Sequence, residues 1–337
     1  EELKFEKTIR DVAAAAGVSP STVSRFLNKN GYVSAPAYER ILQAIKDLDY
    51  APSAIAVSLS RNQTKILGVV IPDICGTFFN EVVYAVEKAA EAYGYRVLLC
   101  NSDNNVEKER SAIEELLSYK VGGLVIVPVN FLTDNNLKLI NDVWRGGTPV
   151  VCVDRELPGF EGDGVYIDNE PGLHEIIDQL VQQGHSRFAV IHEGISLPIE
   201  QFRIHSIDTA LQNNGLVLRK DFIVDIHQET VSYAVPIHRV LQDPEPPTAV
   251  LALSSTATVS AVCAIYSCGR KIPDDVLLVG FDDFHTLDAF GYSVEFSPKP
   301  LELGTVAART LLRRLEHPGE ANAAQRIVLR TCMQIKK

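Results

Sequence analysis

The sequence has no long hydrophobic run, although hydrophobic residues make up 46% of its 337 residues. No stretch approaches the roughly 20 apolar residues that a membrane helix needs. The first ten residues, Glu1–Arg10, are charged and lack the apolar segment of a secretory signal. We therefore expect a cytoplasmic protein without a membrane segment, long enough for two or three domains and apolar enough to bury a sizeable core.

Paired cysteines are also missing. The six cysteines and eight histidines are scattered, with no CxxC pair and no cysteine–histidine cluster at the spacing of zinc ligands. The two nearest cysteines, Cys263 and Cys268, are five residues apart and would lie on different faces of a helix. The sequence predicts small buried thiols, no bound metal and no cofactor.

The usual catalytic motifs do not occur. There is no GxxxxGK[ST] phosphate loop, no GxSxG nucleophile elbow and no HExxH zinc motif. The glycines of Gly159–Gly164 precede a predicted strand, whereas a dinucleotide-binding GxGxxG follows a strand and opens a helix. Asp282 and Asp283 are adjacent, so their side chains diverge and need not form a catalytic pair. We expect no enzymatic activity.

Positive charge is scarce over most of the chain. The net charge is −11, but residues 1–61 hold eight Lys/Arg and seven Asp/Glu, a balance of +1 that leaves −12 for the other 276 residues. An acidic body repels phosphate, so any contact with nucleic acid is confined to the first 61 residues. Their weak positive charge predicts modest non-specific affinity for DNA.

The first fifty residues follow the pattern of three short helices. Thr8 can cap a helix over Ile9–Ala16, whose apolar residues recur at helical spacing, and Gly17 ends that helix. Ser19 caps a second helix that begins at Pro20, where a missing N–H costs nothing, and a third helix follows Ser34. Helix, glycine-containing turn and short helix form a helix-turn-helix.

The second helix separates apolar from polar residues. Val23, Phe26 and Leu27 form its buried face. The opposite face carries hydroxyl and amide groups and one arginine, as a helix that reads a DNA groove requires. An all-helical protein-interaction module without a DNA role is the alternative, which this polar face disfavours. The outward residues are Ser21, Thr22, Ser24, Arg25 and Asn28.

These residues closely resemble the head of the LacI/GalR family of bacterial regulators. The resemblance is carried by Thr8–Ala13 (TIRDVA), Ala16–Ser19 (AGVS), Thr22–Asn28 (TVSRFLN) and Tyr50–Pro52 (YAP). It implies that the second helix enters the major groove of DNA. Residues implied to face base edges are Pro20, Ser21 and Arg25, with Arg25 able to contact guanine. Residues implied to hold phosphates are Thr22, Ser24, Asn28 and Ser34.

Residues 52–60 (PSAIAVSLS) resemble the hinge helix of the same family. The resemblance implies that this helix forms when two chains meet on DNA, and that Leu59 inserts into a base step and bends the duplex. Ser53 replaces a common asparagine and Val57 a common arginine, which removes a basic group near the minor groove. A flexible linker is the alternative.

After Lys65 the sequence alternates between apolar runs and amphipathic stretches, which predicts parallel strands covered by helices on both faces. Eight strands of this kind allow one doubly wound sheet or two smaller sheets. The apolar runs are Ile66–Pro72, Arg96–Cys100, Leu124–Val129, Val150–Asp154, Val165–Asp168, Phe188–His192, Ala249–Leu253 and Val276–Asp282.

The resemblance favours two sheets. Ile66–Asp73 (ILGVVIPD), Gly122–Ile126 (GGLVI) and Val279–Asp282 (VGFD) are similar to the family's body, which has two Rossmann-like lobes like a type I periplasmic binding protein. We expect a head over 1–51, a hinge over 52–65 and a body over 66–337. The chain would cross between lobes near Gly164, near Val294 and within 321–326, giving an N-lobe of about 66–164 plus 295–321 and a C-lobe of about 165–294 plus 322–337.

Ligands of open α/β sheets bind beyond the carboxyl ends of the strands, which makes Asp73, Asp154 with Arg155, and Asp282 with Asp283 candidates. Carboxylates and guanidinium groups hold sugar hydroxyls, and Phe78 and Phe79 could cover a sugar ring. The resemblance adds Arg203 and places Asp282 opposite it. Ser254 and Ser255 stand where relatives usually carry Asn-Asp. The candidate effector residues are Asp73, Phe78, Phe79, Asp154, Arg155, Arg203, Ser255 and Asp282.

The sequence thus predicts a DNA-binding regulator, by resemblance a repressor, that binds a palindromic operator as a homodimer. Its effector would be a small polar molecule such as a sugar or sugar derivative, or an acidic or phosphorylated ligand held by Arg155 and Arg203. Control by a protein partner, or no effector at all, stays open because of Ser254 and Ser255. A transport-type solute receptor would suit the body alone, but it would not carry a helix-turn-helix.

Overall fold

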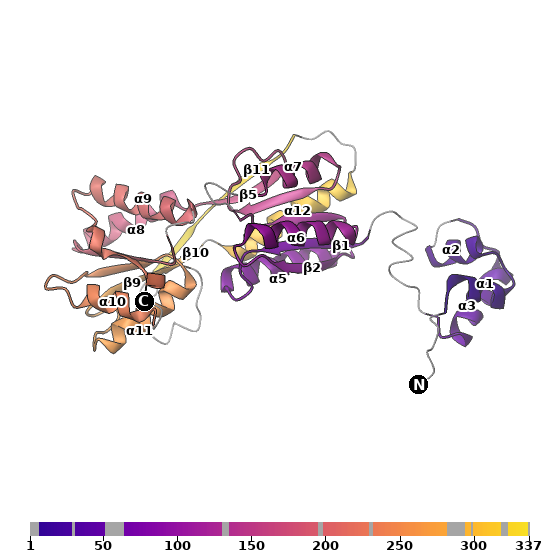
Figure 1. Ribbon diagram of the computed structural model, residues 1–337, viewed down its shortest axis with the longest axis horizontal. Helices are drawn as coiled ribbons and strands as arrows, with labels where there is room; N and C mark the ends of the chain where they lie inside the picture. Colours follow the sequence, from indigo (N-terminus) through magenta and orange to yellow (C-terminus); the bar gives the residue numbers. More distant parts are fainter. Residues whose placement is uncertain are drawn as a thin grey trace. The chain divides into compact units, whose positions relative to one another are not determined.

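The computed structural model describes residues 7–28, 31–50, 64–129, 135–194, 198–228, 232–281, 294–297, 299–317 and 323–335, with backbone alone at residues 28, 294–297 and 332–335. The chain divides into two compact units, Glu1–Lys65 and Ile66–Lys337. They are the head and the body (Figure 1), and each has its own core. None of the described helices is long and apolar enough to cross a membrane.

The head contains three helices: α1 (Ile9–Ala16), α2 (Pro20–Asn28) and α3 (Ala35–Asp47). The predicted start and end of the first helix and the predicted start of the second are confirmed. The apolar stripes meet in a small core because each helix is too short to be stable without packing. The buried residues of this core are Val12, Ala13, Ala16, Val23, Ile41, Ala44 and Tyr50, with Phe26 and Leu27 packed half-buried against it.

Local hydrogen bonds set the helix-turn-helix geometry. The backbone N–H and hydroxyl of Thr8 both donate to the Asp11 carboxylate, at 2.7 and 2.8 Å. Gly17 ends α1 with a φ of +64°, a conformation that glycine adopts without strain. The Ser19 hydroxyl accepts the N–H of Thr22 at 3.2 Å and caps α2. These contacts fix the turn that orients α2.

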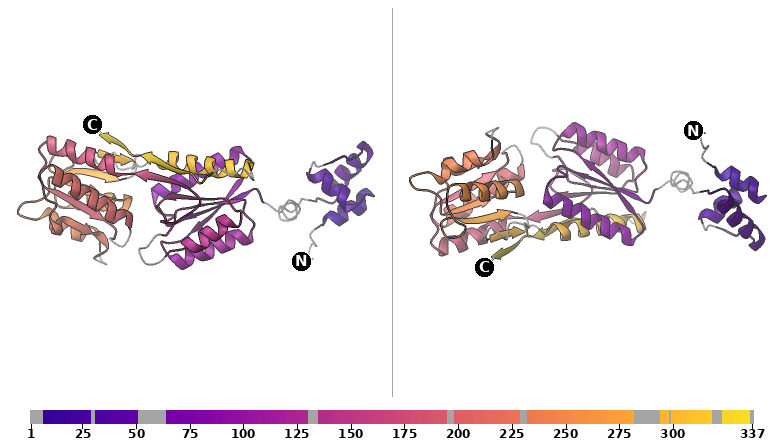
Figure 2. Two further views of the ribbon diagram at one scale, coloured as in Figure 1. Left: turned by 90° about the horizontal axis from the view of Figure 1, so that it is seen from above. Right: turned by 90° about the horizontal axis from the view of Figure 1, so that it is seen from below.

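The N-lobe of the body is a parallel six-stranded sheet in the order β11-β5-β4-β3-β1-β2. Helices α5 and α12 cover one face and helices α6 and α7 the other (Figure 2). Gly304 lets α12 approach α5 closely, since a Cβ there would meet the Val82 carbonyl oxygen at 2.3 Å. The elements are β1 (Ile66–Ile71), α5 (Thr77–Ala92), β2 (Arg96–Asn101), α6 (Val106–Ser118), β3 (Gly123–Ile126), α7 (Leu137–Arg145), β4 (Val150–Asp154), β5 (Asp163–Asp168), α12 (Pro300–Glu316) and β11 (Arg326–Arg330).

The C-lobe is a second six-stranded sheet in the order β12-β10-β9-β8-β6-β7, parallel except for the pair β10 and β12. Helices α8 and α9 pack on one face, and α10 and α11 on the other. The elements are α8 (Glu170–Gln182), β6 (Phe188–His192), α9 (Pro198–Asn213), η1 (Lys220–Phe222), β7 (Ile223–Asp225), η2 (Ile226–Gln228), α10 (Ala234–Leu241), β8 (Ala249–Ala252), α11 (Ser255–Ser267), β9 (Leu277–Phe281), β10 (Val294–Ser297) and β12 (Cys332–Ile335).

Two lobes crossed three times confirm the predicted architecture, but the crossings lie later in the chain than the sequence suggests. Strand β5 pairs with β11 up to Asp168, so the first crossing follows Asp168 rather than Gly164. Strand β10 belongs to the C-lobe, which puts the second crossing between Ser297 and Pro300. Strand β11 belongs to the N-lobe, so the third crossing is Thr331 and not the segment 321–326. Each crossing is set by the sheet that the neighbouring strand joins, and strand pairing cannot be read from the local sequence.

Candidate functional site

The carboxyl ends of β1, β4 and β8 meet the start of α9 at a cavity of about 140 Å³, which we call the polar cavity. Its position agrees with the rule that ligands bind beyond the carboxyl ends of parallel strands. Both lobes contribute to it. The lining residues are Asp73, Gly76, Phe78, Phe79, Asn104, Asp154, Arg155, Glu193, Ile199, Glu200, Arg203, Leu253, Ser254, Ser255 and Thr256. Seven of the eight candidate effector residues are among them, and the eighth, Asp282, lies outside the described residues.

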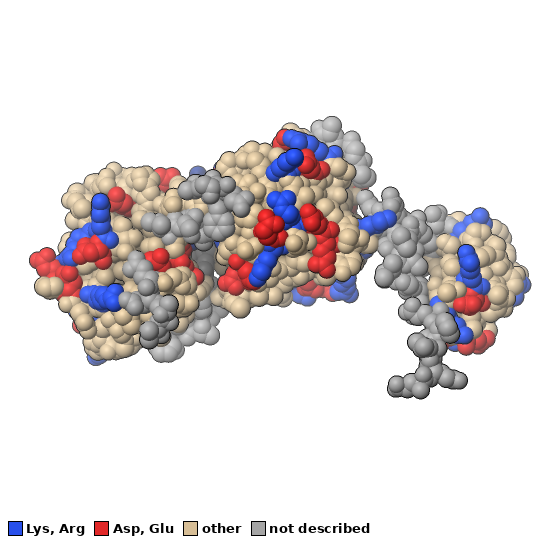
Figure 3. Space-filling model, in the orientation of Figure 1, with Lys and Arg blue, Asp and Glu red and all other residues tan. Residues whose placement is uncertain are grey.

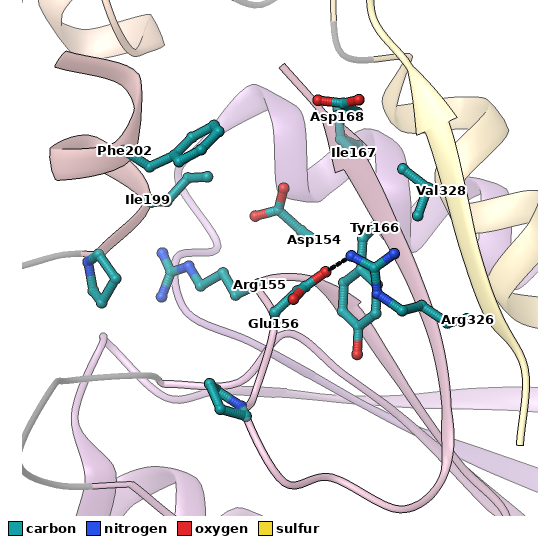
Figure 4. Close-up of a pocket in the computed structure, with 12 residues that line it drawn as sticks. Asp154, Arg155, Glu156, Tyr166, Ile167, Asp168, Ile199, Phe202, Arg326 and Val328 are labelled. Atoms are coloured by element: carbon teal, nitrogen blue, oxygen red, sulfur yellow. Dashed lines mark hydrogen bonds and ion pairs between the residues drawn. The ribbon is translucent and has the colours of Figure 1, made fainter. Parts of the chain in front are cut away.

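Asp154 ends β4 in an unusual backbone conformation. Its φ is +66°, in the left-handed region that side-chain-bearing residues rarely adopt. No described residue donates a hydrogen bond to its carboxylate, and the side chain points into the pocket region of Figure 4. Burial raises the pKa of Asp154, an effect opposed by the positive charges of Arg155 and Arg203. Strain of this kind is often kept at binding sites, and here it aims a carboxylate with free acceptor capacity at the cavity.

Arg155 supplies a buried cation beside this carboxylate. Its Nη1 donates to Oδ1 of Asn104 at 2.7 Å, and the centre of its guanidinium lies 5.8 Å from the ring centroid of Phe79. The residue is only 8% exposed, and its Nε has no partner among the described residues. Burial lowers the pKa of Arg155, an effect opposed chiefly by Asp154. A ligand that accepts a hydrogen bond would satisfy the remaining donors.

Arg203, on α9, brings a second guanidinium to the cavity from the C-lobe. Its Nη1 donates to the Leu253 carbonyl at 2.9 Å, and its guanidinium centre stacks 4.7 Å from the Phe281 ring centroid. The Nε of Arg203 is also buried without a partner in the described part of the chain. Arg155 and Arg203 therefore bring two positive charges to one cavity from different lobes, and Asp154 adds a negative charge there.

The serines that follow β8 have structural contacts of their own. The Ser254 hydroxyl accepts the N–H of Ala257 at 3.1 Å and so caps α11, and it donates to the Glu193 carboxylate. Ser255 is the first residue of α11 and lines the cavity. These hydroxyls begin the helix at the place where the resemblance implies an amide and a carboxylate.

The two phenylalanines differ in their surroundings. Phe78 is 9% exposed and packs in the N-lobe core, whereas Phe79 is half-buried with its ring 5.1 Å from that of Phe78 in an edge-to-face arrangement. Both phenylalanines line the polar cavity, and the ring of Phe79 lies 5.8 Å from the guanidinium centre of Arg155. Asp73 stabilises the turn before α5, since its Oδ1 accepts the N–H of Cys75 at 2.8 Å.

Sequence reasoning missed four polar residues of the cavity: Asn104, Glu193, Glu200 and Thr256. Glu193 directly follows β6, so the strand-end rule could have named it. Glu200 is 4% exposed and accepts the N–H of Glu193 at 3.2 Å while its carboxylate lies 3.3 Å from Nδ1 of His192. No local pattern indicates that contact.

The candidate DNA-reading surface is the outward face of α2. Pro20, Ser21 and Arg25 are exposed there, and Thr22 and Ser24 are half-buried. The Ser19 hydroxyl lies 2.7 Å from that of Ser21 and 2.9 Å from that of Thr22, which orders this edge of the helix. Ser34 is exposed at the start of α3. The side chain of Asn28 and all of Leu59, with the hinge over 52–63, lie outside the described residues.

The surface of the body carries charges of both signs (Figure 3). On the face shown in Figure 3, basic and acidic side chains lie interspersed. The ion pairs of the body include Arg145 with Glu161 and Arg96 with Glu91. Paired charges attract phosphate weakly. The geometry thus agrees with confining DNA contacts to the head.

Comparisons with known proteins cover both units. Residues 8–53 match the bacterial regulatory proteins of the lacI family, and residues 177–336 match the periplasmic binding protein-like domain. The ribose operon repressor of Halalkalibacterium halodurans is 33% identical, with 92% of this chain and 90% of that protein covered. The transcriptional regulator KdgR of Bacillus subtilis is 31% identical, with 98% and 97% covered. The Lac repressor dimer bound to operator and the anti-inducer ONPF has a TM-score of 0.82 at 24% identity, with 98% of both chains covered, and so shares the fold.

Proposed function

Because the chain belongs to the LacI family of bacterial regulatory proteins, we propose that it represses transcription by binding a palindromic operator as a homodimer. The chain is a DNA-binding transcriptional regulator and not an enzyme. Its place of action is the cytoplasm, where bacterial DNA lies. The effector is a small polyhydroxylated molecule, a sugar or sugar derivative, bound in the polar cavity.

The observation that carries this proposal is the pairing of donors and acceptors across the lobes. Among the described residues, the Asp154 carboxylate accepts no hydrogen bond, and the buried Nε atoms of Arg155 and Arg203 have no partner. A diol offers both, since each hydroxyl donates one hydrogen bond and accepts others. A name such as ribose operon repressor for the 33% identical relative agrees with a sugar ligand.

On the DNA side we assign base contacts to Pro20, Ser21 and Arg25, and phosphate contacts to Thr22, Ser24, Asn28 and Ser34. The exposed start of α2 and the single arginine on its outer face support this assignment. Leu59 would act as a wedge between base pairs at the centre of the operator. If so, Leu59→Ala reduces both operator bending and affinity, and a duplex bent as before would refute the wedge.

Ligand and DNA are coupled through the lobes. The effector touches Asp154 and Arg155 in one lobe and Arg203 in the other, so binding favours one lobe angle over others. That angle sets the separation of the two hinges in a dimer and hence their fit to the operator. Coupling of this kind amounts to about 1–3 kcal/mol in typical allosteric proteins.

The experiment that tests this function has two readouts on the full chain. Selection from random duplexes should return an inverted repeat with half-sites about one helical turn apart. Melting temperature with a panel of sugars, sugar acids and sugar phosphates should rise for a single class, since ligand at 100 times its Kd adds roughly 2.7 kcal/mol. If no ligand of the panel raises the melting temperature while DNA binding is intact, control by a protein partner or effector-independent control takes the place of the carbohydrate effector. If selection enriches no motif, the proposed binding to a palindromic operator is wrong.

A further inference from the structure

The start of α11 brings hydroxyl groups to the polar cavity where the resemblance implies an amide and a carboxylate. Ser254 and Ser255 line the cavity there, and the Ser254 hydroxyl caps α11 by accepting the N–H of Ala257 at 3.1 Å. A serine hydroxyl carries no charge and donates a single hydrogen bond. An amide and a carboxylate reach the cavity from other elements instead: Asn104 follows β2 and Glu193 follows β6.

Asn104 lies in a tight turn between β2 and α6. Asp103 and Asn104 both adopt the left-handed conformation, with φ of +50° and +51°, which asparagine and aspartate adopt more readily than other side-chain-bearing residues. The N–H of Asn104 donates to the Pro72 carbonyl at 3.1 Å, and the N–H of Ser102 donates to the Ile71 carbonyl at 2.8 Å. These bonds tie the turn to the end of β1 and hold Asn104 at the cavity.

The side chain of Asn104 positions Arg155. Its amide oxygen accepts a hydrogen bond from Nη1 of Arg155 at 2.7 Å, and both residues line the polar cavity. A guanidinium group is planar, so holding Nη1 also fixes the plane in which its remaining donors lie. Asn104 therefore orients a buried cation of the effector site from a turn that is itself held in place.

Glu193 brings a carboxylate to the cavity from the end of β6. This carboxylate accepts the hydroxyl of Ser254, and its Oε2 lies 3.9 Å from Nε2 of His227. The backbone N–H of Glu193 donates to the Glu200 carboxylate at 3.2 Å. The side chain of Glu193 keeps 30% of its surface exposed, so it is held in place without being buried.

Glu193 and Ser254 meet because strands β6 and β8 pair directly in the C-lobe sheet. Parallel neighbours end at the same edge of a sheet, so a carboxylate that follows β6 can occupy the space that a carboxylate following β8 would fill. Asn104 belongs to the N-lobe and lines the same cavity. The amide and the carboxylate thus contribute to one cavity from different lobes.

We propose that Asn104 and Glu193 supply the amide and the carboxylate of the effector site that Ser254 and Ser255 lack. Asn104 is a positioning residue for Arg155, and Glu193 accepts a hydrogen bond from a hydroxyl of the effector. The serines after β8 are then part of a rearranged effector site, in which Ser254 orients Glu193. This inference rests on the proposed carbohydrate control and names two residues that determine its affinity.

Single variants of the full chain test the assignment. D-ribose, D-glucose, D-galactose and D-xylose are titrated by calorimetry, and the sugar with the lowest Kd serves as the probe. Glu193→Gln exchanges the carboxylate for a neutral amide of similar size and should raise the Kd of the probe about tenfold, as expected for one hydrogen bond to a charged group. Asn104→Gly removes the amide and relaxes the left-handed backbone, so it should raise Kd without lowering the melting temperature.

Two further variants of the same turn serve as controls. Asp103→Gly relaxes a φ of +50° at a residue that does not line the cavity, and should keep Kd within about twofold of the unchanged protein. Asn104→Asp keeps an oxygen that accepts the hydrogen bond from Arg155, and should bind the probe more tightly than Asn104→Gly.

A double variant separates replacement of a carboxylate from a structural role of Glu193. Ser255→Asp in the Glu193→Gln background returns a carboxylate to the position after β8, and an acidic residue suits the first turn of α11. This double variant should regain most of the affinity that Glu193→Gln loses. Ser255→Asn in the same background adds a side chain of the same size without charge and should not regain it.

The outcomes are distinct. Glu193→Gln and Asn104→Gly variants that bind the probe as tightly as the unchanged protein would overturn the assignment and leave the proposed function standing. If Ser255→Asp restores no more affinity than Ser255→Asn, Glu193 does not replace a carboxylate after β8. A chain that binds none of the four sugars loses both this assignment and the proposed carbohydrate effector.

Discussion

The guanidinium of Arg314 makes two hydrogen bonds to the fully buried carboxylate of Asp163, from Nε at 2.9 Å and from Nη2 at 2.8 Å. The same carboxylate accepts the backbone N–H of Gln325 at 2.8 Å. One side chain at the start of β5 thereby joins α12 to the residue that precedes β11. The contact ties together segments that are more than 150 residues apart in the sequence.

Removing the cation should therefore destabilise the N-lobe. We expect Arg314→Ala to lower the free energy of unfolding by about 3 kcal/mol, because it leaves a buried carboxylate without its partner. Arg96→Ala is the control, since its pair with Glu91 is exposed and should contribute less than about 1 kcal/mol. Urea denaturation of both variants measures the difference. Equal losses of unfolding free energy would show that the buried contact with Asp163 stabilises the protein no more than an exposed ion pair.

Glu109 should make stability depend on pH. Burial raises the pKa of Glu109 to about 7 from an ordinary value of 4.5, although Val129 donates its N–H to the carboxylate at 3.0 Å. The folded state then holds a proton that the unfolded state releases, so stability falls as pH rises from about 4.5 to 7 and is level above. The loss through this one group is about 3 kcal/mol.

Glu109→Gln isolates this effect. The amide carries no charge, and its NH2 can donate to Oδ1 of Asn136, which is buried without a partner among the described residues. We expect the variant to be as stable as the unchanged protein at pH 5 and more stable at pH 8. Denaturation curves at several pH values test this, and parallel pH profiles for the two proteins would contradict a raised pKa at this site.

Replacing Asp154 should lower effector affinity without lowering stability. Asp154→Gly removes the strain of the left-handed backbone and a half-buried carboxylate, so we expect unfolding free energy to stay level or rise by up to about 1 kcal/mol while effector affinity falls. Lys120→Gly relieves a φ of +53° outside the polar cavity and should leave affinity unchanged. A thermal melt measures stability and calorimetric titration measures effector affinity, so the two effects are obtained separately. A variant that binds effector normally would exclude Asp154 from the site.

Arg25 should determine sequence preference on DNA. Arg25→Ala should cost about 1–3 kcal/mol at one base pair of each half-site and leave weak, salt-sensitive binding. Lys46→Ala changes an exposed cation on α3 and should keep the same preferred sequence. Affinities for operator variants measure the effect, and unaltered discrimination in Arg25→Ala would mean that another part of the head reads the bases.

The elements that the sequence predicts well are those with strong local signals. Gly17 and Ser19 mark the end of α1 and the cap of α2, and the buried strands β1, β4 and β6 are continuous Val/Ile-rich runs. Strand β11 (RIVLR) was not predicted because arginines flank three apolar residues and its partner β5 is about 160 residues away. Gly164 suggests a connection between lobes, whereas its role is to accommodate the Tyr166 ring.

The candidate site was predictable where strand ends supply it. Asp73 and Asp154 follow from the positions of β1 and β4, and Arg203 follows only from family resemblance. That Phe78 packs mainly in the core, and that Ile199 and Arg203 line the polar cavity, depends on how α5 and α9 are rotated against their sheets. Rotation of a helix is set by tertiary packing, which a single sequence does not display.

The three crossings also govern how the body can be made. Residues 326–330 complete an edge of the N-lobe sheet, and residues 332–335 complete an edge of the C-lobe sheet, with Thr331 alone between them. During synthesis the head can fold as soon as α3 has left the ribosome, but neither sheet is whole until these residues follow. A nascent body therefore presents two open sheet edges at once, and a ribosome that stalls before Arg326 releases a chain in which both lobes, and not just the later one, lack an edge strand.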